Sequence, residues 1–287
     1  MISVKTITTV VALGATLVAS SAAAQCRPPS SSHEARLLAF YEAPIVFSMA
    51  GAPERLSFGA LRLGGEVIPV PSPSPVLQHP SYCYQYTTNN TKLAPVFGRP
   101  RATIGLPASF ALEASYLPSI TVGDAQANLA SFALSRIQTA PLTGGRMALL
   151  LRAHLTTGQV RGSITCPRSN LQSDDVAAPC YGSQPSRDTF HPNSYGFEAA
   201  LATNSEGGGI GAYAGAGVSS LTPLFRAGFT DGLGHVDNTT VDVDLVRGVA
   251  FGGATIRPTS SIAISAQLYV VPADVTTIRI GAQYRLR

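Results

Sequence analysis

The chain has 287 residues and a formal net charge of +4, and only 13% of its residues are charged. A typical soluble domain carries roughly 25% charged residues, so the composition is unusual for one. Beyond the N-terminal segment no apolar run approaches the ~20 residues of a membrane-spanning helix, which excludes helical membrane organisation. Basic residues form no stripe with interleaved aromatic residues, so we expect no nucleic-acid partner.

The N-terminus has the layout of a cleaved secretory signal. Lys5 precedes the apolar run "ITTVVALGATLVA", and an Ala-x-Ala pattern ends before Gln25. This arrangement predicts a signal peptide over residues 1–24 and export of the mature chain. A lipoprotein signal is excluded because Gln25 precedes Cys26, where lipid attachment requires a small residue. An uncleaved anchor is disfavoured because the apolar run is short for a spanning helix.

Four cysteines in an exported chain indicate two disulfides. Cys166 and Cys180 bracket a polar, proline-bounded loop and are expected to pair, which leaves Cys26 for Cys83. Zinc binding is a weaker interpretation because no Cys-x-x-Cys pair occurs, and buried reduced thiols are a further alternative. We expect neither a metal nor a cofactor.

Residues 25–54 are expected to form a separate lead-in with one short helix. Ser31 stands three residues before Glu34, which is typical of a capping box, and Pro44 ends the helical pattern. The following "PIVFSMA" is a candidate first strand. Seven prolines between Pro69 and Pro100 indicate a long loop.

From Arg101 onward, the chain alternates between apolar and small or polar residues, which is typical of strands. "RMALLLRAHLT", "SYGFEAALAT", "SSIAISAQLYV" and the terminal "TTIRIGAQYRLR" show the pattern most clearly. Candidate strands lie near 55–68, 99–106, 109–118, 126–138, 145–156, 193–204, 209–219, 222–231, 240–256, 260–271 and 276–287. Bacterial single-chain barrels have even strand numbers, so either "PIVFSMA" brings these eleven to twelve or a weak early strand is discarded to leave ten.

The non-apolar faces distinguish a barrel from a sandwich. They are mostly Gly, Ala and Ser with isolated charges, which suits a crowded barrel interior, whereas a sandwich presents large polar residues to water. We therefore predict an all-β, antiparallel up-and-down transmembrane barrel of about 10–12 strands over residues 55–287, with long loops near 69–99 and 157–192. A predicted charge network in the lumen comprises Glu113, Glu198, Asp242, Asp244, Arg146, Arg152, Arg279 and Arg285.

Strand counting allows two assignments for the side of the membrane on which the Cys166–Cys180 loop lies. If the last strand ends in the periplasm, counting backward places the Cys166–Cys180 loop in the periplasm as well, although long loops are usually external. An additional strand in "GQVRGSIT" would reverse that assignment.

The signal peptide, the alternating strands and the last strand running to the terminus together resemble the outer-membrane β-barrel proteins of diderm bacteria. The resemblance implies outer-membrane lipid and the barrel-assembly machinery as partners. The chain departs from the family pattern at Arg287, where the last strand commonly ends in Phe or Trp. The lead-in followed by strands is also loosely similar to barrel transporters for hydrophobic compounds, whose N-terminal segment plugs the lumen.

Signals for catalysis are few. His154 and Thr156 share one strand face at a spacing similar to the His-x-Ser of outer-membrane lipid hydrolases, but Thr replaces Ser and the pair faces the presumed lumen. We therefore expect no enzyme. The expected function is a narrow or plugged conduit for small or hydrophobic solutes, or a structural barrel, with an unidentified solute. The alternative is a secreted all-β sandwich for binding or adhesion.

Overall fold

The structure, a computed structural model, describes residues 25–79, 81–83, 95–142, 145–205, 209–272 and 274–286. The expected signal peptide, residues 1–24, and the terminal Arg287 lie outside the described residues.

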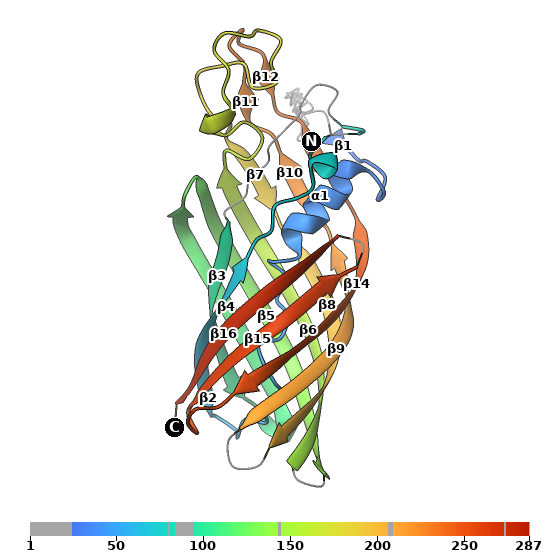
Figure 1. The fold of residues 1–287 in the computed structure, drawn as a ribbon, viewed down its shortest axis with the longest axis vertical. Coiled ribbons are helices and arrows are strands. Elements are labelled where there is room, and N and C mark those ends of the chain that lie inside the picture. The colour runs from blue at the N-terminus through green and yellow to red at the C-terminus, as the bar shows by residue number, and fades with distance from the viewer. Residues whose placement is uncertain are drawn as a thin grey trace, which may run out of the picture.

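Ten antiparallel strands form the wall of a closed barrel (Figure 1). They are β2 (Leu61–Pro69), β3 (Val96–Gly105), β4 (Phe110–Val122), β5 (Ala125–Leu142), β6 (Gly145–Gly162), β8 (Ser194–Ser205), β9 (Ile210–Leu221), β14 (Leu245–Ile256), β15 (Ile262–Val271) and β16 (Val275–Leu286). Each pairs with its neighbours in chain order, and β16 pairs with β2 to close the ring. The predicted up-and-down barrel is therefore confirmed, with ten strands, and the sandwich is not favoured.

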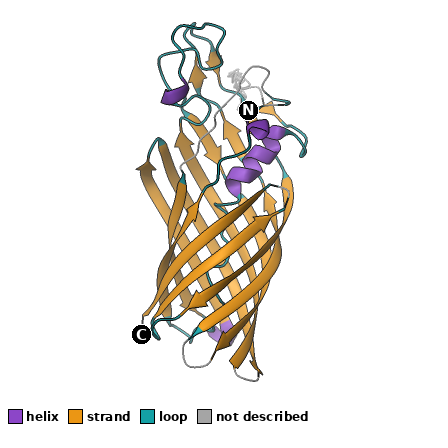
Figure 2. Ribbon diagram, in the orientation of Figure 1, coloured by secondary structure: helices purple, strands orange, loops and turns teal. Residues whose placement is uncertain are grey.

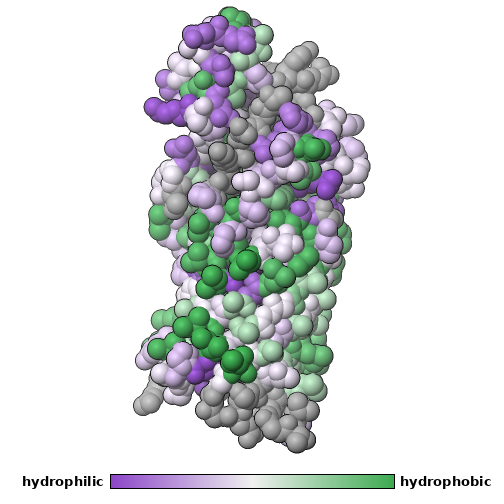
Figure 3. Space-filling model, in the orientation of Figure 1, coloured by the Kyte–Doolittle hydropathy of each residue, from purple (hydrophilic) through white to green (hydrophobic). Residues whose placement is uncertain are grey.

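The alternation in the sequence separates an outer and an inner face. In β16, Ile278 and Ile280 are 55% and 52% exposed on the outside, while Arg279 between them is only 3% exposed inside. Successive side chains of a strand point to opposite faces, so one parity meets the surroundings and the other fills the lumen. Figure 3 shows many hydrophobic side chains over the strand wall and mainly hydrophilic ones at the end farthest from the C-terminus.

The two ends of the barrel differ. The connections β3–β4, β5–β6, β8–β9 and β14–β15 are short and share one end with the C-terminus, here called the turn end. The longer connections β2–β3, β6–β8 and β9–β14 lie at the other end, here called the loop end, together with the short β4–β5 and β15–β16 turns (Figure 1). The Cys166–Cys180 loop therefore lies opposite the C-terminus. The segment "GQVRGSIT" adds no further strand, because its first five residues are the end of β6 and the last three are not in a strand. The predicted strand 222–231 was the source of the ambiguity, because it is not a wall strand and it shifted the count by one.

A lobe of short strands rises from the loop end. β7 (Asp188–His191), β10 (Leu224–Arg226), β13 (Thr240–Asp242) and β1 (Gln25–Cys26) extend the sheet beyond β6, and β11 (Phe229–Thr230) pairs with β12 (Val236–Asp237). Disulfides join Cys26 to Cys83 and Cys166 to Cys180. The loops are shorter than expected because β3 begins at Val96 and β6 continues to Gly162.

The lead-in enters at the loop end and runs down the lumen to the start of β2. Its helix α1 (His33–Glu42), the purple helix at the mouth in Figure 2, is capped by Ser32, whose hydroxyl accepts from the Ala35 N–H at 3.1 Å. The cap is thus one residue later than the sequence indicated. Residues 44–50, "PIVFSMA", form no strand and lie inside the barrel, which corrects that prediction. We call residues 33–56 the plug.

Helical structure is otherwise limited to three short 3₁₀ turns, at Pro75–Gln78, Pro107–Ser109 and Arg168–Asn170, within the described ranges. In those ranges no helix is both long and apolar enough to cross a membrane.

Candidate functional site

Four buried arginines of the barrel wall hold the plug by its backbone. Arg99 donates to the carbonyls of Ile45 and Val46, both at 2.8 Å, and Arg101 donates to that of Ser48 at 2.6 Å. We call Arg99, Arg101, Arg152 and Arg279 the arginine clamp.

The other two clamp residues lie on β16 and β6, to either side of β3 around the wall. Arg279 donates to the carbonyls of Ala43 at 2.9 Å and Val46 at 3.0 Å, and Arg152 donates to that of Phe47. Extended plug backbone has no strand partner, so these charge-assisted bonds satisfy carbonyls that would otherwise be buried without donors.

Acidic residues alternate with the clamp around the wall. Glu66 accepts from Arg99 at 2.5 Å and from Arg101 at 2.6 Å. Glu113 bridges Arg101 and Arg152, at 2.6 Å from each. The four arginines of the clamp exceed the three acids of this ring, Glu66, Glu113 and Glu198. Each of the four arginines also donates to at least one plug carbonyl, so wall and plug share one polar network.

An aromatic ring of the plug fills the centre of this network. Phe47 is fully buried, and the guanidinium carbons of Arg99, Arg101 and Arg152 lie 4.7, 4.3 and 4.8 Å from its ring centroid. Cations favour the negative face of an aromatic ring, so Phe47 supports three like charges that would otherwise repel one another. The lumen at this level is occupied by side chains and plug backbone.

Further plug contacts continue to the turn end. The Gln283 side chain donates to the Ala50 carbonyl at 2.7 Å, and the Ala52 N–H donates to the Thr255 hydroxyl at 2.7 Å. At the turn end Glu54 forms ion pairs with three arginines, Arg62, Arg257 and Arg285. The plug is therefore fixed along its whole course.

The predicted lumen network is only partly brought together. Glu113, Glu198, Arg152 and Arg279 all lie in the lumen, and Arg152 and Glu198 approach to 3.6 Å. Arg285 points inward at the turn end but pairs with Glu54 instead of the predicted acids. Arg146 belongs to β6, but its side chain lies outside the described part of the structure.

Asp242 and Asp244 were placed wrongly. Asp242 belongs to the short strand β13 in the lobe and pairs with Arg27 at 2.9 Å, while Asp244 is exposed between β13 and β14. The residues of "TVDVDLV" do alternate, but both aspartates precede the wall strand β14, which begins at Leu245. Their position in the alternation therefore does not place them in the lumen.

Sequence reasoning missed Glu66, Arg99 and Arg101. The two arginines flank Pro100 at the end of the proline-rich stretch that indicated a loop. Their two-residue spacing places both on one strand face, and this was the signal that could have revealed them.

His154 and Thr156 are both buried in the lumen. The side chain of His154 is 0% exposed and lies 3.9 Å from Glu198, and the Thr156 hydroxyl lies 3.0 Å from that of Ser131. The pair faces the interior, away from the outer surface where a lipid ester would lie. In the described ranges no three His, Cys, Asp or Glu side chains gather as a metal site.

The wall is interrupted between β3 and β4. Their ladder pairs only residues 102–105 with 111–114, and toward the loop end the described residues of the two strands are not paired with each other. β4 also carries a bulge between Leu117 and Ile120 in its pairing with β5. Pro100 and Pro118 lie on these diverging segments, and proline, which lacks an N–H, is tolerated at sheet edges and bulges.

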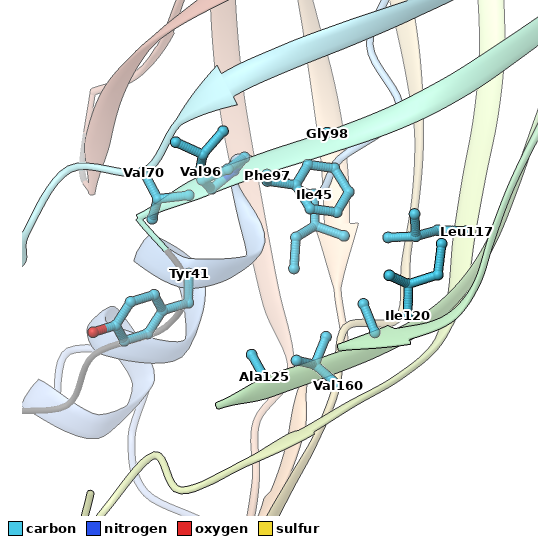
Figure 4. A pocket seen from close by; sticks show the side chains of 12 residues that line it. Tyr41, Ile45, Val70, Val96, Phe97, Gly98, Leu117, Ile120, Ala125 and Val160 are labelled. Atoms are coloured by element: carbon cyan, nitrogen blue, oxygen red, sulfur yellow. The ribbon is translucent and has the colours of Figure 1, made fainter. Parts of the chain in front are cut away.

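A cavity of about 230 Å³ lies at this interruption (Figure 4). We call it the lateral cleft. Val96 and Ile120 line it and are 46% and 54% exposed, so the cleft reaches the outer surface of the wall. Its inner side is formed by Tyr41 and Ile45 of the plug. Its lining is otherwise apolar: Pro44, Val70, Phe97, Gly98, Leu117, Ala125, Ala127 and Val160.

No protein-family model matches the chain, and no curated protein matches it. Among solved structures the chain is similar to Ail, the attachment invasion locus protein of Yersinia pestis, with 11% identity, coverage of 80% of this chain and 100% of that chain, and a TM-score of 0.32.

The fold itself defines the class of protein. An even-numbered, antiparallel, up-and-down barrel with an apolar outer face and short turns at one end is the architecture of bacterial outer-membrane β-barrels. The chain has this architecture, together with a clamped plug and a lateral cleft.

Proposed function

We propose that this protein lies in the bacterial outer membrane, closes its lumen to ions with the plug, and admits small hydrophobic solutes through the lateral cleft. The interruption of the β3–β4 ladder carries the proposal. A barrel normally pairs all its strands because unpaired backbone groups facing lipid are costly. An opening lined by apolar side chains, at a position where two prolines reduce the number of unpaired donors, is consistent with a passage.

The chemistry of the cleft favours an uncharged, apolar solute. Its lining offers no charged side chain, and its volume exceeds the ~150 Å³ of an engineered cavity that binds benzene but falls below the roughly 300–1,000 Å³ of drug-sized pockets. The lumen, by contrast, is occupied by the plug and crossed by the buried charges of the clamp and its acids. We therefore place the route at the wall, with the loop end external because long loops are usually external in this class.

Photoaffinity labelling tests the proposal. A small alkyl diazirine, added to the full chain in lipid nanodiscs, should label the segments around Val96 and Ile120 saturably, and unlabelled alkane should compete. Ala127→Leu, which fills the cleft, should reduce this labelling several-fold. Ala153→Leu is the matched control because Ala153 faces outward on β6. Labelling spread evenly over the outer face, unaffected by competitor or by Ala127→Leu, would refute the proposal.

A further inference from the structure

A polar surface lies on the outer wall directly beyond the apolar residues of β6. The outward residues Met147, Leu151 and Leu155 are 39–44% exposed, and the next outward positions are Thr157, Gln159 and Arg161. From Met147 to Thr157 a strand tilted by about 40° rises ~25 Å, the height of the apolar band in outer-membrane barrels. Thr157 therefore marks the membrane boundary on the loop side.

Amides and a histidine surround a hollow at this boundary. We call it the amide hollow; it measures about 460 Å³ and is lined by Asn128, Ala130, Thr157, Gly158, Gln159, His191 and Asn193. Glycine is required at position 158 of this hollow, because its φ is +137° and a Cβ there would collide with the Asn128 carbonyl oxygen of β5.

The polar groups of the hollow are oriented by their neighbours. The Thr157 hydroxyl donates to the Asn193 side-chain oxygen at 2.8 Å, which leaves the Asn193 amide N–H groups without a partner among the described residues. The Nδ1 of His191 lies 3.1 Å from the Gly158 carbonyl, so Nδ1 carries the proton and Nε2 remains for another partner. The hollow therefore presents amide donors and an imidazole nitrogen, a set that suits sugar hydroxyl and amide groups.

Three arginines stand above the hollow. Arg161 pairs in register with Thr189 of β7, and Thr189 pairs with Arg226 of β10, so the two arginines share one row about 10 Å apart. Arg187 precedes β7 by one residue, and all three arginines are exposed. None of them takes part in an ion pair with any residue the structure describes, and Asp124 of the nearby β4–β5 turn forms none with them either. The row therefore presents exposed guanidinium groups that no described carboxylate pairs with.

The arrangement, from the membrane outward, is apolar residues, then amides and a hydroxyl, then arginines. From it we infer that this surface binds an outer-leaflet glycolipid whose sugar head group carries phosphate. The acyl chains lie along Phe132 and Leu155, which are 45% and 44% exposed. The sugar occupies the amide hollow, and Arg161 and Arg226 bind the phosphate, since guanidinium groups bind phosphate with paired N–H donors. The site is separate from the lateral cleft and does not depend on the function proposed for it.

Native mass spectrometry of the full chain in detergent tests the inference. The probe is a hexa-acyl glucosamine disaccharide with two phosphates, compared with the same lipid after dephosphorylation and with inorganic phosphate. We expect the wild type to retain the phosphorylated lipid and R161Q/R226Q to bind it at least tenfold more weakly, as expected for the loss of one or more charge-assisted bonds. Arg168→Gln, which changes an exposed arginine elsewhere in the lobe, should bind within about twofold of wild type.

Each comparison can overturn the inference. Equal retention by R161Q/R226Q and wild type removes the arginines from the site. Equal retention of the dephosphorylated lipid removes phosphate recognition. Competition by inorganic phosphate at the concentration of the lipid would assign the site to a soluble anion instead. The faster migration of unboiled protein on gels verifies that each variant is folded, so none of these results reflects a misfolded barrel.

Discussion

Truncation of Phe47 is the simplest test of how the plug is held. Phe47→Ala removes a fully buried ring, which costs about 3–5 kcal/mol in protein cores. It also removes the face on which three guanidinium groups rest, at 4.3–4.8 Å from the ring centroid, each contact being worth about 0.5–2 kcal/mol. These guanidinium groups keep their carboxylate and carbonyl partners, so we expect a total loss of about 4–6 kcal/mol in the free energy of unfolding.

The assay is urea unfolding in detergent micelles, read as loss of the fast-migrating folded band on unboiled gels. Phe58→Ala is the matched control because Phe58 lies just after the plug, before β2, and is 76% exposed. We expect Phe58→Ala to change stability by less than about 0.5 kcal/mol. A midpoint for Phe47→Ala no lower than that of Phe58→Ala would refute the clamp as the origin of plug stability.

Three further predictions follow from the same contacts. Glu113→Gln leaves Arg101 and Arg152 facing each other without their shared carboxylate, and we expect a loss of about 3–5 kcal/mol in urea unfolding; a loss below about 1 kcal/mol would contradict the ring. Gly51→Ala should destabilise the plug, because φ is +101° and a Cβ would lie 2.9 Å from the Thr255 hydroxyl; an unchanged midpoint would contradict this. Burial raises the pKa of Glu34, but the N–H groups of Cys83, Tyr82 and Ser81 outweigh it and hold that pKa below the usual 4.5. The stability advantage of wild type over Glu34→Gln should therefore be full at pH 7 and decline as the pH falls below about 4.5, and a pH-independent difference would contradict it.

The barrel was predictable from the sequence because its main signal is local. Alternation with a period of two appears in each strand separately and needs no knowledge of the partner strand. The lead-in helix was predictable for the same reason, since a cap and a stop at Pro44 are local features. The course of "PIVFSMA" was not, because an extended plug segment and a strand have the same backbone form and differ only in what surrounds them.

The candidate site depended on pairing between distant residues. Arg99 and Arg101 meet Glu66 across neighbouring strands, and the predicted strand near 99–106 does not by itself show which side chains of another strand they meet. Asp242 has the expected parity but belongs to a strand of the lobe. The lateral cleft arises where β3 and β4 fail to pair, and only Pro100 and Pro118 hinted at this in the sequence. The absence of a ladder between two strands is a property of the fold and leaves no periodic signal.

The closed lumen is the central claim of this account, and planar-bilayer recording of the wild-type chain tests it most directly. With the plug bound by four arginines and its turn end held by Glu54, we predict no steady current at either polarity. A large, steady, nonselective conductance would contradict the account, because it would show that water and ions cross a lumen that the clamp and plug should fill.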